Sequence, residues 1–232
     1  MKIWVDQPVT EAEGTGVAMK ARVTRYPVDA LLVLGGLLVL ALSALPVDER
    51  TVSGVEEGFF RPVNDLPSLL YEPLWVFMQL GNFLVVPLAA LAAFVARRRR
   101  LAGGLLLGGL LTYGLAKVVK RIVTRGRPFR LLADVNIHGA AGKGLGFVSG
   151  HAAVVAALLV VAWPWLSRPA RSVAVILVSC VWIGRVYVGA HLPLDIVGGA
   201  ALGVAAGGVV RLLIGRPVVA EPPGEAEEDA AY

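Results

Sequence analysis

Charged residues and cysteine are both scarce in this chain, and each shortage excludes a class of protein. Asp, Glu, Lys and Arg make up 17% of the 232 residues, whereas hydrophobic residues make up 56%. Because soluble domains carry about 25% charged residues, this composition argues against a soluble domain. A single cysteine, Cys180, excludes an internal disulfide and gives no basis for a thiolate metal site.

The surplus of basic residues does not indicate a nucleic-acid-binding protein either. The formal net charge is +5, but the sequence has no basic stripe interleaved with aromatic residues. The charges cluster instead between long apolar runs, and the mean hydropathy is +0.71. This pattern predicts an all-α, polytopic membrane protein with about six transmembrane helices in a bundle.

A helix needs about 20 residues to cross a hydrocarbon core about 30 Å thick. Glycine-rich runs within the apolar stretches suit close contact between helices in lipid, because small side chains let two backbones approach. We expect a flexible cytoplasmic segment at 1–28, a six-helix membrane domain at 29–216 and an acidic, disordered cytoplasmic tail at 217–232. The six expected spans are 30–47, 74–96, 101–119, 148–166, 173–190 and 194–214.

The short basic loops predict how the chain is oriented. With six spans, ARVTR (21–25), RRRR (97–100), the arginines at 168 and 171 and the arginine at 216 all fall on one side. The positive-inside rule makes that side, and both termini, cytoplasmic. The first apolar run is expected to be an uncleaved signal anchor, because the segment before it is long for a signal peptide; cleavage after LSA is the alternative.

One basic segment, KRIVTRGRPFR (120–130), falls on the external side and breaks this rule. An anionic ligand would account for it. An interfacial anchor on anionic lipid head groups, formed by Arg125, Arg127 and Arg130, would account for it equally well.

Three separated parts of the chain are expected to bring polar groups to this same external face. They are the end of the third span, the start of the fourth, and the junction of the fifth and sixth. The residues concerned are Lys120 and Arg127; Ser149, Gly150 and His151; and Arg185, His191 and Asp195.

These residue types suit phosphoryl transfer. Arginine forks match phosphate oxygens, and the free N–H groups at a helix start favour an anion. One histidine can attack phosphorus while another protonates the leaving oxygen. Asp195 follows His191 by four residues, so its carboxylate can accept the Nδ1–H of the imidazole. Asp195 could equally cap the sixth helix.

Arg185 and His138 differ in how readily an ordinary structural role explains them. An arginine within an apolar span, as at Arg185, costs about 2.5–3.5 kcal/mol on the insertion scale, so a partner or a ligand is expected for it. His138, in the loop VNIHGAAGKG, is interpreted as an ordinary interfacial histidine whose hydrogen bonds are satisfied.

The three clusters also resemble a known family. KRIVTRGRP (120–128), VSGH (148–151) and GRVYVGAHLPLD (184–195) are similar to the signatures K-x6-R-P, P-S-G-H and S-R-x5-H-x3-D of the type 2 phosphatidic-acid phosphatase superfamily, the lipid phosphate phosphatases. The resemblance covers about 74–214. Two positions depart from the pattern: Val148 replaces a proline and Gly184 replaces a serine.

The resemblance implies a role for each matching residue. Lys120, Arg127, Ser149, Gly150 and Arg185 would bind phosphate. His151 would be the general acid, His191 the nucleophile and Asp195 its supporting carboxylate. It also implies a six-helix fold and catalysis without a metal or other cofactor.

The predicted function is therefore a membrane-integral lipid phosphate or diphosphate phosphatase. It would act through a phospho-histidine on the extracytoplasmic face of a prokaryotic plasma membrane. Polyprenyl diphosphate, phosphatidic acid and phosphatidylglycerol phosphate are the candidate substrates. The alternatives are a non-catalytic transporter or scaffold for anionic lipid, and a proton-coupled carrier using His191 and Asp195 with Gln79 and Asn82 deeper in the bundle.

Overall fold

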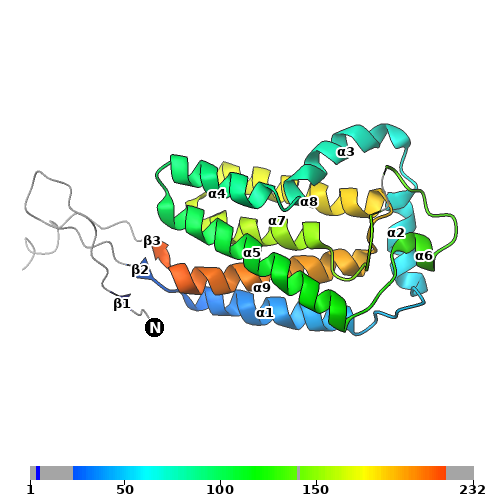
Figure 1. Ribbon diagram of the computed structural model, residues 1–232, viewed down its shortest axis with the longest axis horizontal. Coiled ribbons are helices and arrows are strands. Elements are labelled where there is room, and N and C mark those ends of the chain that lie inside the picture. The colour runs from blue at the N-terminus through cyan, green and yellow to red at the C-terminus, as the bar shows by residue number, and fades with distance from the viewer. Residues whose placement is uncertain (1–3, 6–22, 140–141, 218–232) are drawn as a thin grey trace, which may run out of the picture.

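The computed structural model describes residues 4–5, 23–139 and 142–217, most of which form helices that lie side by side (Figure 1). Within these residues, four helices are long and apolar enough to cross a membrane. They are α1 (Pro27–Ala44), α5 (Arg99–Ile122), α8 (Arg168–Tyr187) and α9 (Pro193–Ile214). The predicted all-α membrane bundle is confirmed by this arrangement.

The second expected span is not one straight helix. It consists of η1 (Ser68–Leu70), α3 (Tyr71–Met78), η2 (Gln79–Gly81) and α4 (Val85–Val95), bent by 68° at the break. The cause is local, because Asn82 has an extended backbone and its Oδ1 accepts the N–H of Leu84 at 3.1 Å. The helical hydrogen-bond ladder is therefore interrupted inside a continuous apolar run.

The fourth expected span is also shorter than predicted. α7 (Gly150–Ala162) has 13 residues and passes into the 3-10 turn η3 (Trp163–Trp165) at Pro164. At about 1.5 Å per residue α7 is about 20 Å long, less than a hydrocarbon core. By length and composition the described residues offer four spans, or five with the bent pair, so six spans are not confirmed.

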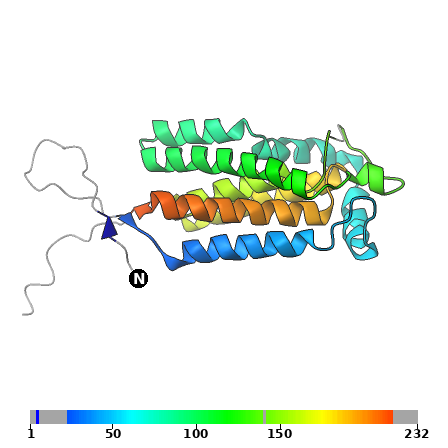
Figure 2. The same cartoon turned by 60° about the horizontal axis from the view of Figure 1, so that its bottom comes forward.

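α9 is the central helix of the bundle. It lies between α1 (blue) and α5 (green) in Figure 2 and also packs along α7. The glycine-rich run at 198–208 makes this possible: a Cβ on Gly203 would lie 2.1 Å from the carbonyl oxygen of Ala153 in α7. On the α1 side, a Cβ on Gly36 would lie 2.7 Å from the carbonyl oxygen of Ala201. The predicted close contacts at this run are confirmed.

One end of the bundle is fastened by a small sheet and a buried ion pair. The strands β1 (Trp4–Val5), β2 (Val23–Thr24) and β3 (Arg216–Pro217) pair antiparallel, with Val23 opposite Pro217. Nearby, Asp29 at the start of α1 bonds Arg211 at the end of α9, with Oδ1 and Nη2 2.6 Å apart. The sequence did not predict this sheet. The rest of the expected cytoplasmic tail, 218–232, and the segment 6–22 lie outside the described residues.

The opposite end of the bundle is crossed by α2 (Gly54–Asn64), beside α6 (Pro128–Leu131) (Figure 1). Ser53 caps α2 by accepting the N–H of Glu56 at 3.2 Å, as a serine N-cap does. Phe60 is fully buried while its neighbour Phe59 is 70% exposed, so one face of α2 packs onto the bundle. This is the end to which the predicted site residues belong.

Candidate active site

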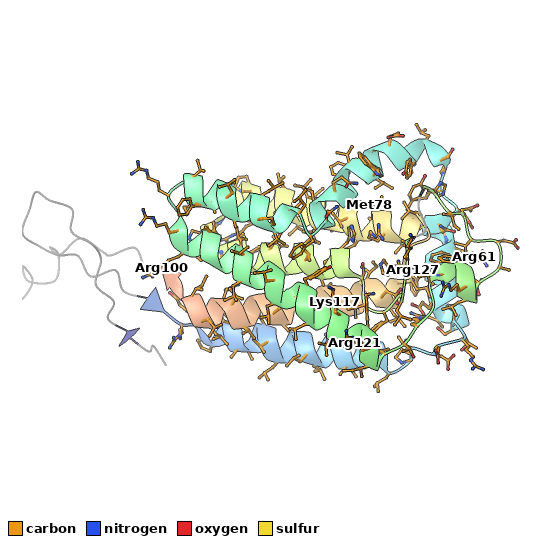
Figure 3. The ribbon with its side chains drawn as sticks, in the orientation of Figure 1. Arg61, Met78, Arg100, Lys117, Arg121 and Arg127 are labelled. Carbon is orange, nitrogen blue, oxygen red and sulfur yellow. The ribbon has the colours of Figure 1, made fainter. Side chains whose placement is uncertain are left out.

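The predicted site residues meet beneath α2, at the end of the bundle where Figure 3 labels Arg127. Lys120 lies in the last turn of α5, and Arg127 lies in the loop that follows it. Ser149, Gly150 and His151 form the start of α7. Arg185, His191 and Asp195 surround the turn between α8 and α9.

His191 and Asp195 form the centre of the site. Oδ2 of Asp195 lies 3.3 Å from Nδ1 of His191 and accepts the backbone N–H of Leu192 at 3.0 Å. Asp195 is fully buried and is the third residue of α9, so it caps the helix and contacts the histidine at once. The helix cap and the contact with His191, which the sequence offered as alternatives, therefore occur together.

The other nitrogen of the His191 ring faces a cation. Nε2 lies 3.4 Å from Nη1 of Arg127. A neutral imidazole that donates Nδ1–H to Asp195 carries its lone pair on Nε2. In that tautomer the lone pair of His191 is on the nitrogen that lies beside Arg127.

The electrostatics of the turn favour this neutral form. Burial first, and then the charges of Arg185, Arg127 and Lys120, hold the pKa of His191 well below its usual value of 6.5. A lowered pKa favours the neutral imidazole at pH 7, which is the form that a nucleophilic role would require.

Two of the predicted phosphate ligands are held in place by carbonyl groups. Nζ of Lys120 donates to the oxygens of Leu145 and Gly146, at 2.9 and 3.1 Å. Arg127 donates to the oxygens of Ala190 and Lys143, at 2.7 and 2.8 Å. Both cations are thus positioned before an anion arrives, which lowers the cost of binding it.

Arg185 is less engaged than the other two cations. Its Nη1 lies 3.9 Å from Sδ of Met78, and its buried Nε has no partner within the described segments. Nε of Arg127 is likewise without a partner among those residues. These guanidinium donors remain available for phosphate oxygens.

The start of α7 faces the same site. Ser149 is its N-cap, with Oγ accepting the N–H of Ala152 at 3.4 Å, and Ser149 N–H donates to the carbonyl of Asp195 at 2.8 Å. The contact joins the start of α7 to the start of α9. The first N–H groups of a helix have no partner inside it, so Gly150 and His151 can present donors to an anion.

The geometry agrees with what comparison with known proteins shows. The family model described as the PAP2 superfamily matches residues 99–217, just over half of the chain. The chain belongs to the PAP2 superfamily. This lipid phosphatase superfamily is the one that the three sequence motifs resemble.

Two relatives of this chain carry different phosphatase names. A decaprenylphosphoryl-5-phosphoribose phosphatase of Mycobacterium tuberculosis is 32% identical over 133 residues, which cover 56% of this chain and 70% of that protein. An undecaprenyl-diphosphatase of Sulfolobus acidocaldarius is 28% identical over 180 residues, covering 72% of this chain and 84% of that protein.

Two crystal structures share the PAP2 fold of this chain. Aquifex aeolicus LpxE matches with a TM-score of 0.63 at 24% identity, covering 68% of this chain and 95% of that one. A transmembrane PAP2-type phosphatidylglycerolphosphate phosphatase from Bacillus subtilis matches with a TM-score of 0.56 at 22% identity, covering 79% of this chain and 94% of that one.

Two charged residues, Arg125 within the first motif and Glu56 outside all three, were given no role in the site from sequence. Arg125 is fully buried, so its interpretation as an interfacial anchor is wrong. It donates to Glu56 and, at 3.2 Å, to Oδ1 of Asp195. Glu56 comes from α2, and the only signal for it in the sequence was an acid near the start of an amphipathic segment. Arg130, by contrast, is exposed, as an anchor would be.

The surroundings of Gly184 and His138 explain two further features of the sequence. A Cβ on Gly184 would lie 2.8 Å from Cγ of Met78, so this glycine makes room for the side chain that contacts Arg185. His138 stacks on Tyr187 at 4.2 Å, with Nε2 3.4 Å from a carbonyl oxygen, consistent with an ordinary satisfied histidine. In the described part of the chain, no group of three or more His, Cys, Asp or Glu side chains could hold a metal ion.

The break in the second span places Gly81 against His151. A Cβ at Gly81 would lie 2.7 Å from Cβ and 2.9 Å from Cδ2 of His151. We therefore expect Gly81→Ala to displace the imidazole and lower kcat for phosphate release about 10- to 100-fold, since a misplacement of about 1 Å can have that effect. Gly114→Ala is the matched control, because its Cβ would meet open space. Equal kcat in both variants, measured with purified protein, would contradict the contact.

Proposed function

We propose that this protein removes the terminal phosphate of a lipid phosphate or diphosphate through a phospho-histidine at His191. The observation that carries the proposal is the placement of His191 between Asp195 and Arg127, with Nδ1 towards the carboxylate and Nε2 towards the cation. A lone pair held in this way is suited to in-line attack on phosphorus.

The reaction would run in two steps. Nε2 of His191 attacks phosphorus, the bond from phosphorus to the lipid oxygen breaks, and His151 protonates the departing oxygen. His151 then accepts a proton from water, which attacks the phospho-histidine, breaks the P–N bond and releases phosphate. Lys120, Arg127 and Arg185 stabilise the charge on the equatorial phosphate oxygens in both steps, and Asp195 balances the positive ring.

The names of the relatives supply the order in which to test substrates. Two relatives are named for decaprenylphosphoryl-5-phosphoribose and undecaprenyl diphosphate, which are both polyprenyl-linked phosphates. These names favour a polyprenyl-linked phosphate as the first substrate. Phosphatidic acid and phosphatidylglycerol phosphate carry the same terminal phosphate and come next.

The proposed location of the site is the extracytoplasmic face of the inner membrane, with both ends of the chain in the cytoplasm. Support comes from the arginine-rich loop that joins α4 to α5 and the first residues of α5, where positions 97–100 are all arginine. In Figure 3, Arg100 lies at the end of the bundle opposite Arg127. If the arginine-rich loop faces the cytoplasm, as the positive-inside rule predicts, the site faces outward.

Phosphate release by the purified protein in detergent, with EDTA present, tests this function. The protein is expected to release phosphate from undecaprenyl diphosphate without added metal. His151→Gln should lower kcat about 10²- to 10⁴-fold, the usual contribution of a general acid, while leaving lipid binding intact. His138→Gln is the matched control, since the contacts of the His138 ring are with Tyr187 and the carbonyl of Asn64, which have no proposed catalytic or phosphate-binding role.

Two results would contradict the proposal. Folded protein that binds the three candidate lipids and releases phosphate from none of them would indicate a non-catalytic lipid-binding protein. Turnover that EDTA abolishes and added metal restores would show that the side chains of the site do not suffice.

A further inference from the structure

The cluster formed by Glu56, Arg125 and Asp195 extends the site beyond the three PAP2 motifs. We propose that Glu56 is a positioning residue: by holding Arg125, it keeps Asp195 directed at His191. The catalytic part of this inference rests on the proposed phosphatase function. The geometric part concerns the histidine ring alone and can be tested separately.

Glu56 is anchored at both of its carboxylate oxygens. Oε1 accepts Nη1–H of Arg125 at 3.0 Å and the backbone N–H of Leu194 at 2.9 Å, while Oε2 accepts Nη2–H of Arg125. Only 4% of the residue is exposed. A carboxylate buried to this degree is stable only with such partners, so its position is tightly defined.

Arg125 joins this carboxylate to the catalytic one. Its Nη1 is shared between Oε1 of Glu56 and Oδ1 of Asp195, the latter at 3.2 Å. Its carbonyl oxygen accepts the N–H of Gly146 at 2.8 Å, which also fixes the backbone at this point. Burial alone would lower the pKa of Arg125, but Glu56 and Asp195 outweigh it and raise that pKa, so Arg125 stays charged.

The division of contacts at Asp195 explains why Glu56 matters. Oδ1 contacts Arg125, and this leaves Oδ2 for Leu192 N–H and His191 Nδ1. With Glu56 engaging both terminal nitrogens of Arg125, the guanidinium makes only one contact with Asp195. Without Glu56, both nitrogens would be free to bind Asp195 in the favoured bidentate way and draw Oδ2 away from His191.

The helix that carries Glu56 is itself held by packing at this end of the bundle. Phe60, one turn further along α2, is fully buried in a cluster with Leu192 and Ile196, which flank the start of α9. Glu56 also satisfies a free N–H at the start of α9 through Leu194. The inner face of α2 and the start of α9 therefore form one unit, and α2 completes the site.

Glu56→Gln keeps the size of the side chain and removes its charge. We expect kcat for phosphate release to fall about 10- to 100-fold, the range measured when outer partners of metal-bound histidines are removed. KM should change less than about threefold, because Lys120, Arg127 and Arg185 are untouched. Glu57→Gln is the matched control: it lies on the same helix and forms a half-buried ion pair with Arg61, one turn along, in place of Arg125. An unchanged kcat in Glu56→Gln would overturn the proposal.

A double-mutant cycle tests whether Glu56 acts through Arg125. If it does, Glu56→Gln should lower kcat no further in a protein that already carries Arg125→Gln. The double variant leaves no unpaired charge at positions 56 and 125, but Asp195 loses Arg125 in it, so its thermal unfolding is compared with that of Arg125→Gln, in which Asp195 loses the same partner. If the loss of kcat in the double variant instead equals the product of the losses in the two single variants, the link through Arg125 is overturned.

The state of the histidine ring provides a readout independent of turnover. The chain contains only three histidines, so ¹⁵N-histidine NMR of the protein in detergent can resolve the signal of His191. The native protein should show His191 with its proton on Nδ1, and Glu56→Gln should shift the population towards Nε2–H. An identical tautomer in both proteins would overturn the positioning role even if no substrate had been found. Native protein that shows Nδ1–H but releases no phosphate would instead count against the proposed function.

Discussion

Replacing His191 with alanine is expected to lower kcat for phosphate release by about 10⁵-fold or more. In enzymes that form a covalent intermediate, removing the nucleophile reduces turnover to the level that binding and charge stabilisation sustain alone. The three cations remain in this variant, two of them held by the carbonyls of Leu145, Gly146, Ala190 and Lys143. Inorganic phosphate should therefore still protect the variant against thermal unfolding.

The matched control for His191→Ala is His138→Ala, which removes the histidine stacked on Tyr187 and leaves every proposed catalytic and phosphate-binding residue in the sequence. Initial rates on undecaprenyl diphosphate, together with phosphate-dependent melting temperatures, check both expectations. Turnover in His191→Ala within tenfold of the native rate would mean that another group attacks phosphorus.

Asp195→Asn is expected to lower kcat about 10³- to 10⁴-fold, as loss of the carboxylate does in serine-protease triads. An amide has one oxygen and one NH₂ group, but both oxygens of Asp195 accept hydrogen bonds. Whichever way the amide turns, its NH₂ group faces another donor, either Arg125 or the N–H of Leu192. The positive charge that forms on His191 during attack also loses its counter-ion.

Rapid-quench measurement of the first turnover separates these effects of Asp195→Asn from product release. Asp65→Asn is a suitable control, because Asp65 accepts one exposed hydrogen bond, from Asn136, at the end of α2. A loss of less than tenfold in Asp195→Asn would show that His191 does not depend on this carboxylate.

Much of the site could be predicted because its residues are close in sequence or follow a motif spacing. The four-residue interval from His191 to Asp195 suggested a hydrogen bond, and the two side chains lie 3.3 Å apart although only Asp195 is helical. The serine before Gly150 marked the start of α7, since a serine N-cap satisfies a free N–H. Local chemistry of this kind can be read from the sequence.

The contact between Glu56 and Arg125 joins residues 69 positions apart, and nothing in either local sequence indicates the other. Glu56 lies in an amphipathic segment beside Glu57, a half-buried acid of the same residue type. The packing of Phe60 and the bonds of Glu56 to Arg125 and Leu194 go with Glu56, not Glu57, facing the site. Charge pairs that depend on how a helix docks are not visible in the sequence.

The six straight spans expected from the sequence were not confirmed, for a different reason. Hydropathy records the length of an apolar run, and it does not record whether the backbone continues as one helix. The run at 74–96 contains the extended residue Asn82, and the run at 148–166 contains Pro164. α7 can be short because α5, α8 and α9 surround it, so much of it packs on protein in place of lipid. The break at Gly81 and Asn82 then brings a glycine against His151.

The most direct test of the central claim is to trap and map the covalent intermediate. The purified protein is mixed with a substrate ³²P-labelled in its terminal phosphate, quenched within milliseconds under alkaline conditions, which preserve phospho-histidine, and then digested. The account predicts label on the peptide that contains His191, none in His191→Ala, and more label in His151→Gln if hydrolysis of the intermediate slows more than its formation. Rapid turnover by native protein with no labelled peptide, or with label on any residue other than His191, would contradict it.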